Sequence, residues 1–170
     1  WSPIPNLLDS GTVAVILFHA VFFLLYGRSE EMKYYWMLVK NKVRKYVLAS
    51  HGHMAEGIKS TLEIIVGPQE DLICINAYTK ECQDPMPEFK KIIENNPEDD
   101  IVFMTDMFGG SVNNNAIVLT KNPKVHVVTG INLAVVISII MSDQDADTED
   151  IIKHAVEQAK DMIMYCNELA

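Results

Sequence analysis

Histidine, aspartate and serine residues stand in two short polar stretches, each directly after an apolar run of the sequence. His51 follows the run 46–50, and Asp106 follows the run 101–105 and opens the stretch 106–111. A carboxylate bonded to one imidazole nitrogen fixes the tautomer and leaves the other nitrogen as a nucleophile. Glycines let the backbone approach a phosphate, and a serine can cap a helix or donate to phosphate oxygens. Together the stretches predict a site that holds a phosphoryl group on a histidine nitrogen.

Either stretch alone has an ordinary structural explanation. A histidine at the end of a strand is most often a solvated residue without a chemical role. An aspartate followed shortly by two glycines commonly forms a turn that leads into a helix. The placement of both stretches at the ends of strands favours a functional site more strongly than either stretch does alone.

The elements predicted from the pattern alternate between apolar runs and helical repeats. Continuous apolar runs indicate strands at 46–50, 72–77, 101–105 and 125–129. Apolar residues at helical spacing indicate helices at 54–66, 85–95, 113–120, 133–141 and from 148 onward. This alternation predicts an α/β fold, a doubly wound parallel sheet of four strands with helices on both faces. Because ligands bind beyond the carboxyl ends of parallel strands, residues 50–53, 106–111 and 130–132 should share one edge of the sheet.

Composition and charge exclude several classes of protein. The 170 residues are 49% hydrophobic and 22% charged, which excludes a disordered or fibrous chain. Three scattered cysteines and five histidines show no zinc-ligand spacing, so we expect neither a metal site nor a disulfide framework. The net charge is −9, and residues 46–170 hold eight basic against twenty acidic side chains, a balance of −12. Such a surface repels phosphate backbones, so we expect no nucleic-acid partner.

The first 45 residues differ from the rest of the chain. They hold six basic against three acidic residues and an apolar run at 12–26. The run is shorter than the ~20 residues that cross a bilayer unless residues from Leu7 extend it, and no signal-peptide cleavage site follows. A membrane segment, a helix packed on a partner and artificially joined upstream sequence all stay open. The basic residues after the run predict a cytoplasmic domain at 46–170, with any membrane association through 7–26, after an extension at 1–45.

Three segments resemble a known family in order and at fitting intervals. They are VLASHGHMAEGIKSTLEIIVG, MTDMFGGSVNNNA and VVTGINLAVV, and the resemblance covers about residues 45–165. The chain thereby resembles the IIA domain of the mannose-type sugar phosphotransferase system (PTS). The resemblance implies a histidine that accepts phosphate from the phosphocarrier HPr and passes it to a IIB domain, which acts with the membrane IIC and IID subunits. It also implies that no cofactor takes part, and a homodimer that exchanges a C-terminal strand, for which 162–166 is apolar enough.

The resemblance also assigns roles to individual residues. His51 is the phosphorylated histidine, because it stands in the Ser-His-Gly motif, and Asp106 is the aspartate bonded to it. The residues expected to support the phosphate are Gly52, Phe108, Gly109, Gly110, Ser111 and Asn114. We expect His53 to be a neighbour of the site or part of the surface that HPr contacts. Val112 and Ala134 stand where the family usually has proline, at helix starts that carry no chemistry.

Two other functions from related folds are weighed against this one. The phosphocarrier subunit of dihydroxyacetone kinase has Ser-His-Ser and Asp-Leu-Gly-Ser at these loops, whereas this chain has Ser-His-Gly and Asp-Met-Phe-Gly-Gly-Ser. Sugar-responsive transcriptional activators contain IIA-like domains next to an ATPase and a DNA-binding domain. The 170 residues leave no room for either, but the chain begins with Trp1 and not with Met, so this alternative stays open. A receiver domain would need an acidic pair after the first strand, where Ser50 and His51 stand.

Overall fold

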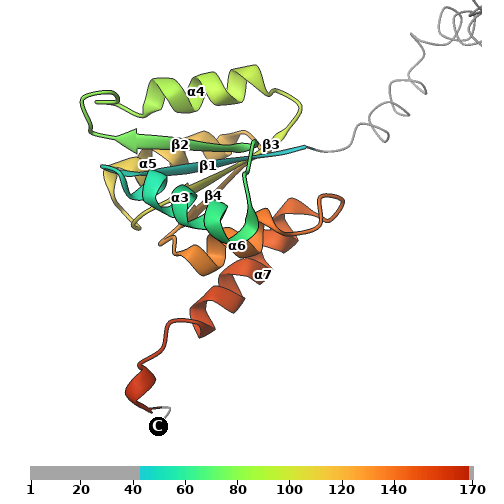
Figure 1. The fold of residues 1–170 in the computed structure, drawn as a ribbon. Helices are drawn as coiled ribbons and strands as arrows, with labels where there is room; N and C mark the ends of the chain where they lie inside the picture. The colour runs from blue at the N-terminus through green and yellow to red at the C-terminus, as the bar shows by residue number, and fades with distance from the viewer. Residues whose placement is uncertain (1–42, 169–170) are drawn as a thin grey trace, which may run out of the picture. The chain divides into compact units, whose positions relative to one another are not determined.

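The computed structural model describes residues 43–168, which lie in a compact unit that spans Lys42–Ala170. Its centre is one sheet of four parallel strands in the order β2-β1-β3-β4 (Figure 1). The strands are β1 (Arg44–His51), β2 (Leu72–Ala77), β3 (Asp100–Thr105) and β4 (Val125–Thr129). The crossover from β2 to β3 passes over β1, so β1 and β3 are the two central strands. This is the parallel sheet that the alternating pattern predicts.

Helices cover both faces of this sheet (Figure 1). The α-helices are α3 (Met54–Val66), α4 (Met86–Asn95), α5 (Ser111–Ile117), α6 (Leu133–Ile140) and α7 (Thr148–Asp161). Two short 3₁₀ turns follow α5 and α7, η1 (Val118–Lys121) and η2 (Cys166–Glu168). Helices α3, α6 and α7 pack on one face, and α4 and α5 pack on the other. The α/β fold class with helices on both faces is therefore confirmed.

The alternation of side chains along β1 explains why the sheet needs both layers. Tyr46 and Leu48 point into the core beneath α3, α6 and α7, while Val47 and Ala49 point into the core beneath α4 and α5. All four side chains are buried. Burial of apolar surface contributes roughly 25 cal/mol per Å² to stability. A shift of β1 by one residue would move each of these side chains to the opposite face of the sheet, so burial in two cores fixes the register of the strand. The carboxyl end of β1 is thereby fixed, and His51 with it.

Element bounds differ from the predicted ones mainly at two places. The helix predicted at 113–120 begins two residues earlier, at Ser111, and gives way to the 3₁₀ turn η1 after Ile117. Strand β1 begins at Arg44 and not at residue 46. Two charged residues, Arg44 and Lys45, therefore belong to the strand, although an apolar run could not have revealed them.

Arg44 is a buried cation at the amino end of β1. Its guanidinium donates from Nε to Thr148 Oγ1 (3.0 Å), from Nη1 to the carbonyl of Asp143 (2.8 Å) and from Nη2 to the carbonyls of Gln144 and Ala146. Thr148 in turn donates to the carboxylate of Asp100. The cluster holds the acidic loop 142–147 against the amino ends of the strands. It lies at the opposite end of β1 from His51.

The two edge strands, β2 and β4, differ in how their outer backbone groups are used. On β2 the carbonyls of Leu72 and Asn76 face away from β1. Lys59 Nζ donates to the first (3.0 Å) and Thr79 Oγ1 to the second (2.9 Å). Side chains of the same domain therefore occupy the β2 edge.

Predictions for the chain ends fall largely outside the described residues. The apolar run 12–26, the wider segment 7–26 and nearly all of the extension 1–45 lie there. Within residues 43–168 no helix is both long enough and apolar enough to cross a membrane. The apolar segment 162–166 follows α7 as exposed chain without strand structure, and its exchange with a second copy stays a prediction.

Candidate functional site

His51 and Asp106 meet where the adjacent strands β1 and β3 end. Oδ2 of Asp106 accepts a hydrogen bond from the backbone N–H of His51 (2.9 Å) and lies 2.7 Å from Nδ1 of its imidazole. The carboxylate side chain is only 11% exposed. Because a carboxylate can only accept, the proton of a neutral imidazole belongs on Nδ1, and Nε2 carries the free electron pair.

Nε2 of His51 is the atom that faces the solvent side of the site. It lies 3.0 Å from Oγ of Ser111, the first residue of α5, and the His51 side chain is 39% exposed. The two ring nitrogens thus have different partners: one is held by a carboxylate and the other stands beside a hydroxyl. This is the arrangement of an oriented nucleophile that an incoming group can reach.

The environment of Asp106 keeps it ionised. Burial raises the pKa of its carboxyl, but hydrogen bonds from the His51 backbone, the His51 ring and the Met107 backbone outweigh burial and lower the pKa below its ordinary value. Oδ1 accepts the Met107 N–H at 2.9 Å. Both carboxylate oxygens are therefore engaged, and a full negative charge stands behind the imidazole.

The turn after Asp106 is shaped by two glycines and a buried asparagine. Gly109 has φ +75°, a conformation that side chains rarely adopt, and its N–H donates to Asn113 Oδ1 (3.1 Å). Asn113 is buried and donates onward to Thr105 Oγ1 (3.1 Å). A Cβ atom on Gly110 would stand 3.2 Å from Cε1 of His51 and 2.9 Å from the Met107 side chain. Gly110 therefore leaves room for the imidazole.

The other predicted support residues occupy different places around this centre. Gly52 has φ +58° and donates its N–H to the carbonyl of Ala77 (2.9 Å), which links the end of β1 to β2. Asn114 is exposed and donates to the carbonyl of Gly109 (3.0 Å). The Phe108 side chain is 79% exposed and is a surface group of the turn. The structure thus brings His51, Asp106, Gly110 and Ser111 into contact and places Gly52, Phe108 and Asn114 around them.

Sequence reasoning missed three residues that shape the site. Ser50 is fully buried, and its Oγ accepts the Ala55 N–H (2.8 Å) at the start of α3. Asn113 holds the glycine turn, although only its neighbour Asn114 was expected to act. Tyr78 stacks on the His51 ring, with 5.3 Å between ring centroids and 24° between planes. Ser50 stands four residues before α3, whose N-cap residue is His53, so its contact gives no ordinary capping signal, and nothing in the sequence indicates the stacking of Tyr78.

His53 lines a neighbouring groove, where its imidazole pairs with Glu56. Its side chain is 70% exposed, and Nδ1 lies 3.4 Å from Oε2 of Glu56.

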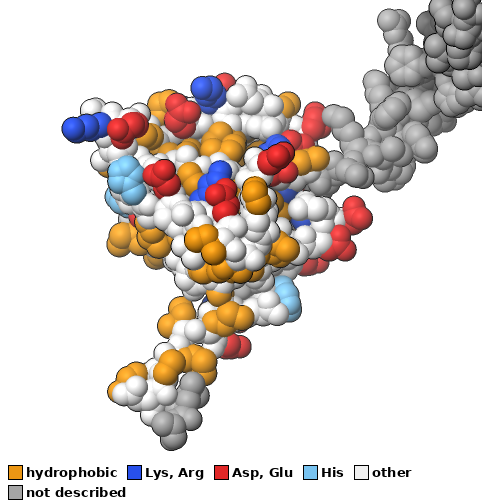
Figure 2. Space-filling model, in the orientation of Figure 1, with side chains coloured by type: hydrophobic (Ala, Val, Ile, Leu, Met, Phe, Trp, Pro, Cys, Tyr) orange, Lys and Arg blue, Asp and Glu red, His pale blue; other side chains and the backbone are white. Residues whose placement is uncertain are grey.

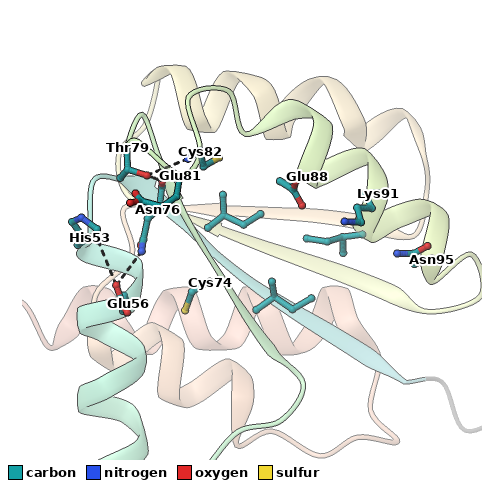
Figure 3. Close-up of a pocket in the computed structure, with 13 residues that line it drawn as sticks. His53, Glu56, Cys74, Asn76, Thr79, Glu81, Cys82, Glu88, Lys91 and Asn95 are labelled. Atoms are coloured by element: carbon teal, nitrogen blue, oxygen red, sulfur yellow. Dashed lines mark hydrogen bonds and ion pairs between the residues drawn. The ribbon is translucent and has the colours of Figure 1, made fainter.

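The groove, of about 550 Å³, runs along the β2 edge between α3 and α4 (Figure 3). Its polar lining residues are His53, Glu56, Asn76, Thr79, Glu81, Glu88, Lys91 and Asn95. Burial raises the pKa of the Cys74 thiol in this groove to about 11.

Exposed apolar side chains surround the carboxyl ends of the strands. Met54, Tyr78, Met107 and Phe108 are each more than two-fifths exposed. Figure 2 shows histidine and hydrophobic side chains close together at the side where the β2 arrow of Figure 1 ends. Exposed apolar groups that gather in this way are typical of surfaces that bind another macromolecule.

This chain matches one known protein family over most of the described residues and is similar to several solved structures. The family described as the PTS system fructose IIA component matches residues 45–156. A structure described as a phosphoenolpyruvate-dependent sugar PTS permease from Klebsiella pneumoniae is 34% identical, with a TM-score of 0.71, and covers 76% of this chain and 96% of its own.

Two further structures share the fold at lower identity. The mannose/sorbose specific IIA subunit from Enterococcus faecalis is 22% identical, with a TM-score of 0.64, over 72% of this chain and 93% of its own. A PTS IIA protein associated with the fucose utilization operon of Streptococcus pneumoniae is 24% identical, with a TM-score of 0.61, over 74% of this chain and 95% of its own.

Proposed function

Because this chain belongs to the fructose/mannose-type IIA family of the sugar PTS, we propose that it carries a phosphoryl group on Nε2 of His51. The donor is phosphorylated HPr and the acceptor is a IIB domain. The observation that carries the proposal is the fixed imidazole, with Nδ1 held 2.7 Å from Asp106 and Nε2 directed at the exposed side of the site.

The transfer step follows from this geometry. The electron pair on Nε2 of His51 attacks phosphorus, a new N–P bond forms, and the N–P bond to the donor histidine breaks. The bonding electrons of that broken bond remain on the donor nitrogen. The proton on Nδ1 stays in its hydrogen bond to Asp106, whose charge balances the positive charge that develops on the ring. Transfer to a IIB histidine reverses these steps.

The turn at 106–111 provides the space and the donors for the phosphoryl group. Ser111 Oγ lies 3.0 Å from the attacking nitrogen, so it can donate to a phosphoryl oxygen after transfer. Backbone N–H groups at the start of α5 lack helical partners and favour negative charge there. Gly109 and Gly110 keep side chains away from this space, while Gly52 and Asn114 hold the loops in place. No cofactor takes part, because transfer between two histidines is nearly isoenergetic and depends on positioning and electrostatics.

Docking and assembly are proposed from the same surface features. The exposed side chains of Met54, Tyr78, Met107 and Phe108 would contact HPr and the IIB domain in turn, because both must bring a histidine to Nε2. The exposed apolar segment 162–166 would join two copies into a homodimer.

The N-terminal extension, predicted at 1–45, is proposed to lie outside the phosphotransfer domain up to residue 41, because Arg44 and Lys45 are part of strand β1. Since Arg44 is buried in that domain, the cleanest test is a chain that begins at Lys42. It should fold cooperatively and accept phosphate at the rate of the full chain. Loss of the cooperative melting transition in this truncation would refute the division.

Phosphate labelling tests the central proposal. The full chain is incubated with enzyme I, HPr and phosphoenolpyruvate, and we expect one acid-labile, base-stable phosphate per chain. His51→Ala should abolish the label. His53→Ala is the matched control and should keep it, because the His53 side chain is 70% exposed and its ring pairs with Glu56 instead of with Asp106 or Ser111. Labelling that survives in His51→Ala and disappears in His53→Ala would overturn the assignment.

A further inference from the structure

Tyr78 covers one face of the imidazole that the proposed function phosphorylates. It follows the last residue of β2, and its ring lies 5.3 Å from the His51 ring, centroid to centroid, at an angle of 24°. The other contacts of the imidazole lie at its edges: Asp106 at Nδ1, Ser111 at Nε2 and Gly110 near Cε1. Among the described residues, Tyr78 is the aromatic side chain that stacks on this face.

The backbone of Tyr78 is held in a conformation that favours glycine or asparagine. Its φ of 59° is the one positive φ of a non-glycine residue within 43–168. Such a conformation persists only where its surroundings fix it, and it is found most often at functional sites. Here the next residue is fixed on several sides: Thr79 Oγ1 donates to the Asn76 carbonyl and accepts the Cys82 N–H, and Thr79 N–H donates to the Cys82 carbonyl (Figure 3).

The link between this turn and the active histidine is also direct. The carbonyl of Ala77, next to Tyr78, accepts the N–H of Gly52, next to His51 (2.9 Å). The strained turn and the histidine loop are therefore joined by a backbone hydrogen bond and a ring stack. Since the ring is still 47% exposed, burial in the core does not account for its position.

We propose that Tyr78 is a positioning residue that stabilises the phosphorylated form of His51, an inference that rests on the proposed function. When Nε2 bears the phosphoryl group and Nδ1 keeps its proton, the imidazole ring carries a positive charge. The face of an aromatic ring attracts a cation placed over it. A stacked tyrosine therefore favours the charged phosphoimidazole over the neutral ring and restrains the tilt of the imidazole plane.

The size of the effect follows from the exposure of the pair. Attraction of a cation by a partly exposed aromatic face changes an equilibrium by about two- to fivefold. Removal of the ring should therefore shift the partition of phosphate between HPr and this chain toward HPr by about two- to fivefold. The phosphorylated chain should also lose its phosphate to water faster, because departure of the phosphoryl group discharges the ring.

The experiment compares three variants of the full chain with wild type. Tyr78→Asn and Tyr78→Gly remove the ring and tolerate the positive φ, whereas Tyr78→Phe keeps the ring and removes only the hydroxyl. After labelling from phosphoenolpyruvate, the equilibrium ratio of phosphorylated chain to phosphorylated HPr and the half-life of the isolated phosphorylated chain are measured. Melting temperatures of the unphosphorylated proteins report on folding separately.

The outcomes separate the role of Tyr78 from the function itself. We expect the Asn and Gly variants to lose phosphate to HPr and to water, and the Phe variant to match wild type. Asn and Gly variants with the wild-type ratio and half-life would overturn the proposal, even if their melting temperatures change. A Phe variant as impaired as the Asn variant would also overturn it, because the hydroxyl and not the ring face would then matter. Absence of label on His51 in wild type would refute the proposed function, and the role of Tyr78 with it.

Discussion

Substitution of Asp106 by asparagine tests how the imidazole is oriented. The two carboxylate oxygens accept three N–H groups: Oδ2 those of the His51 backbone and ring, and Oδ1 that of Met107. An amide has one oxygen and one NH₂ group, so at least one of these donors must face another donor. If the NH₂ replaces Oδ2, the imidazole can bind it only by moving its proton to Nε2, which removes the nucleophile.

The expected loss follows from these contacts. A hydrogen bond to a charged group contributes about 1.5–3 kcal/mol, which corresponds to about 10- to 150-fold in rate if it acts in the transition state. We expect Asp106→Asn to accept phosphate from HPr slower by that factor in rapid-quench measurements at saturating HPr. The melting temperature should fall by only a few degrees, because the side chain lies in a loop at the sheet edge.

A matched control separates this role from simple turn capping. Asp84, like Asp106, accepts a backbone N–H from a residue that follows it in the chain. Its partner is the N–H of Met86, at 3.0 Å, and Asp84 lies outside the site. Asp84→Asn should show a small loss of stability and normal transfer. If Asp106→Asn behaves in the same way, with a lower melting temperature and normal transfer, the orienting role of Asp106 is refuted.

The pH dependence of stability provides a second readout. Burial raises the pKa of Asp106, yet the hydrogen bonds from His51 and Met107 outweigh burial and bring the folded pKa below the ordinary value of 3.8. The stability from this group is therefore complete above the unfolded pKa and is lost as the pH falls through the folded pKa. The melting temperature of wild type should drop below about pH 4, and the gap between wild type and Asp106→Asn should narrow there. A gap that is constant through this range would contradict the assignment.

Three further predictions concern other parts of the domain. Gly110→Ala should slow phosphate acceptance by about three- to tenfold with little change in melting temperature, because the Cβ of the alanine would stand 3.2 Å from Cε1 of His51. Unchanged rates would contradict this prediction. Arg44→Leu should lower the free energy of unfolding by about 3–5 kcal/mol in urea titrations, because it leaves three carbonyls and a hydroxyl without their donor. A loss below about 1 kcal/mol would be inconsistent with the observed cluster. Cys74 should react with Ellman's reagent at pH 8 far more slowly than the exposed Cys166, because burial raises the pKa of the Cys74 thiol to about 11. Equal reaction rates of the two thiols would contradict this prediction.

The fold could be predicted from the sequence because its signals are repeated and local. Each strand contains a run of mostly apolar residues, since both faces are covered, and each crossover contains a recognisable helical repeat. The meeting of His51 and Asp106 could be predicted as well, because both follow neighbouring central strands of a parallel sheet. Their contact depends on topology more than on side-chain detail.

The parts that were missed depend on contacts between residues distant in the chain. Arg44 reads as part of a basic cluster, and its burial depends on carbonyls about a hundred residues away. Tyr78 gives no periodic signal, because its stack on His51 involves one residue with a positive φ and no repeated pattern. Asn113 and Asn114 are alike in sequence, and only the direction of the helix shows that the first points inward and the second outward.

The two edge strands of the sheet differ in how easily a further strand could pair with them. On β2, an incoming strand would have to displace the side chains of Lys59 and Thr79 from the backbone, at about 1 kcal/mol for each hydrogen bond. On β4, the backbone of Val127 and Thr129 faces away from β3, and no side chain within residues 43–168 donates to it. Within residues 43–168, strand-by-strand polymerisation, the usual hazard of an open edge, would therefore begin more easily at β4 than at β2. A copy that covered β4 with its own segment 162–166 would close that edge, and pairing would then end at two molecules.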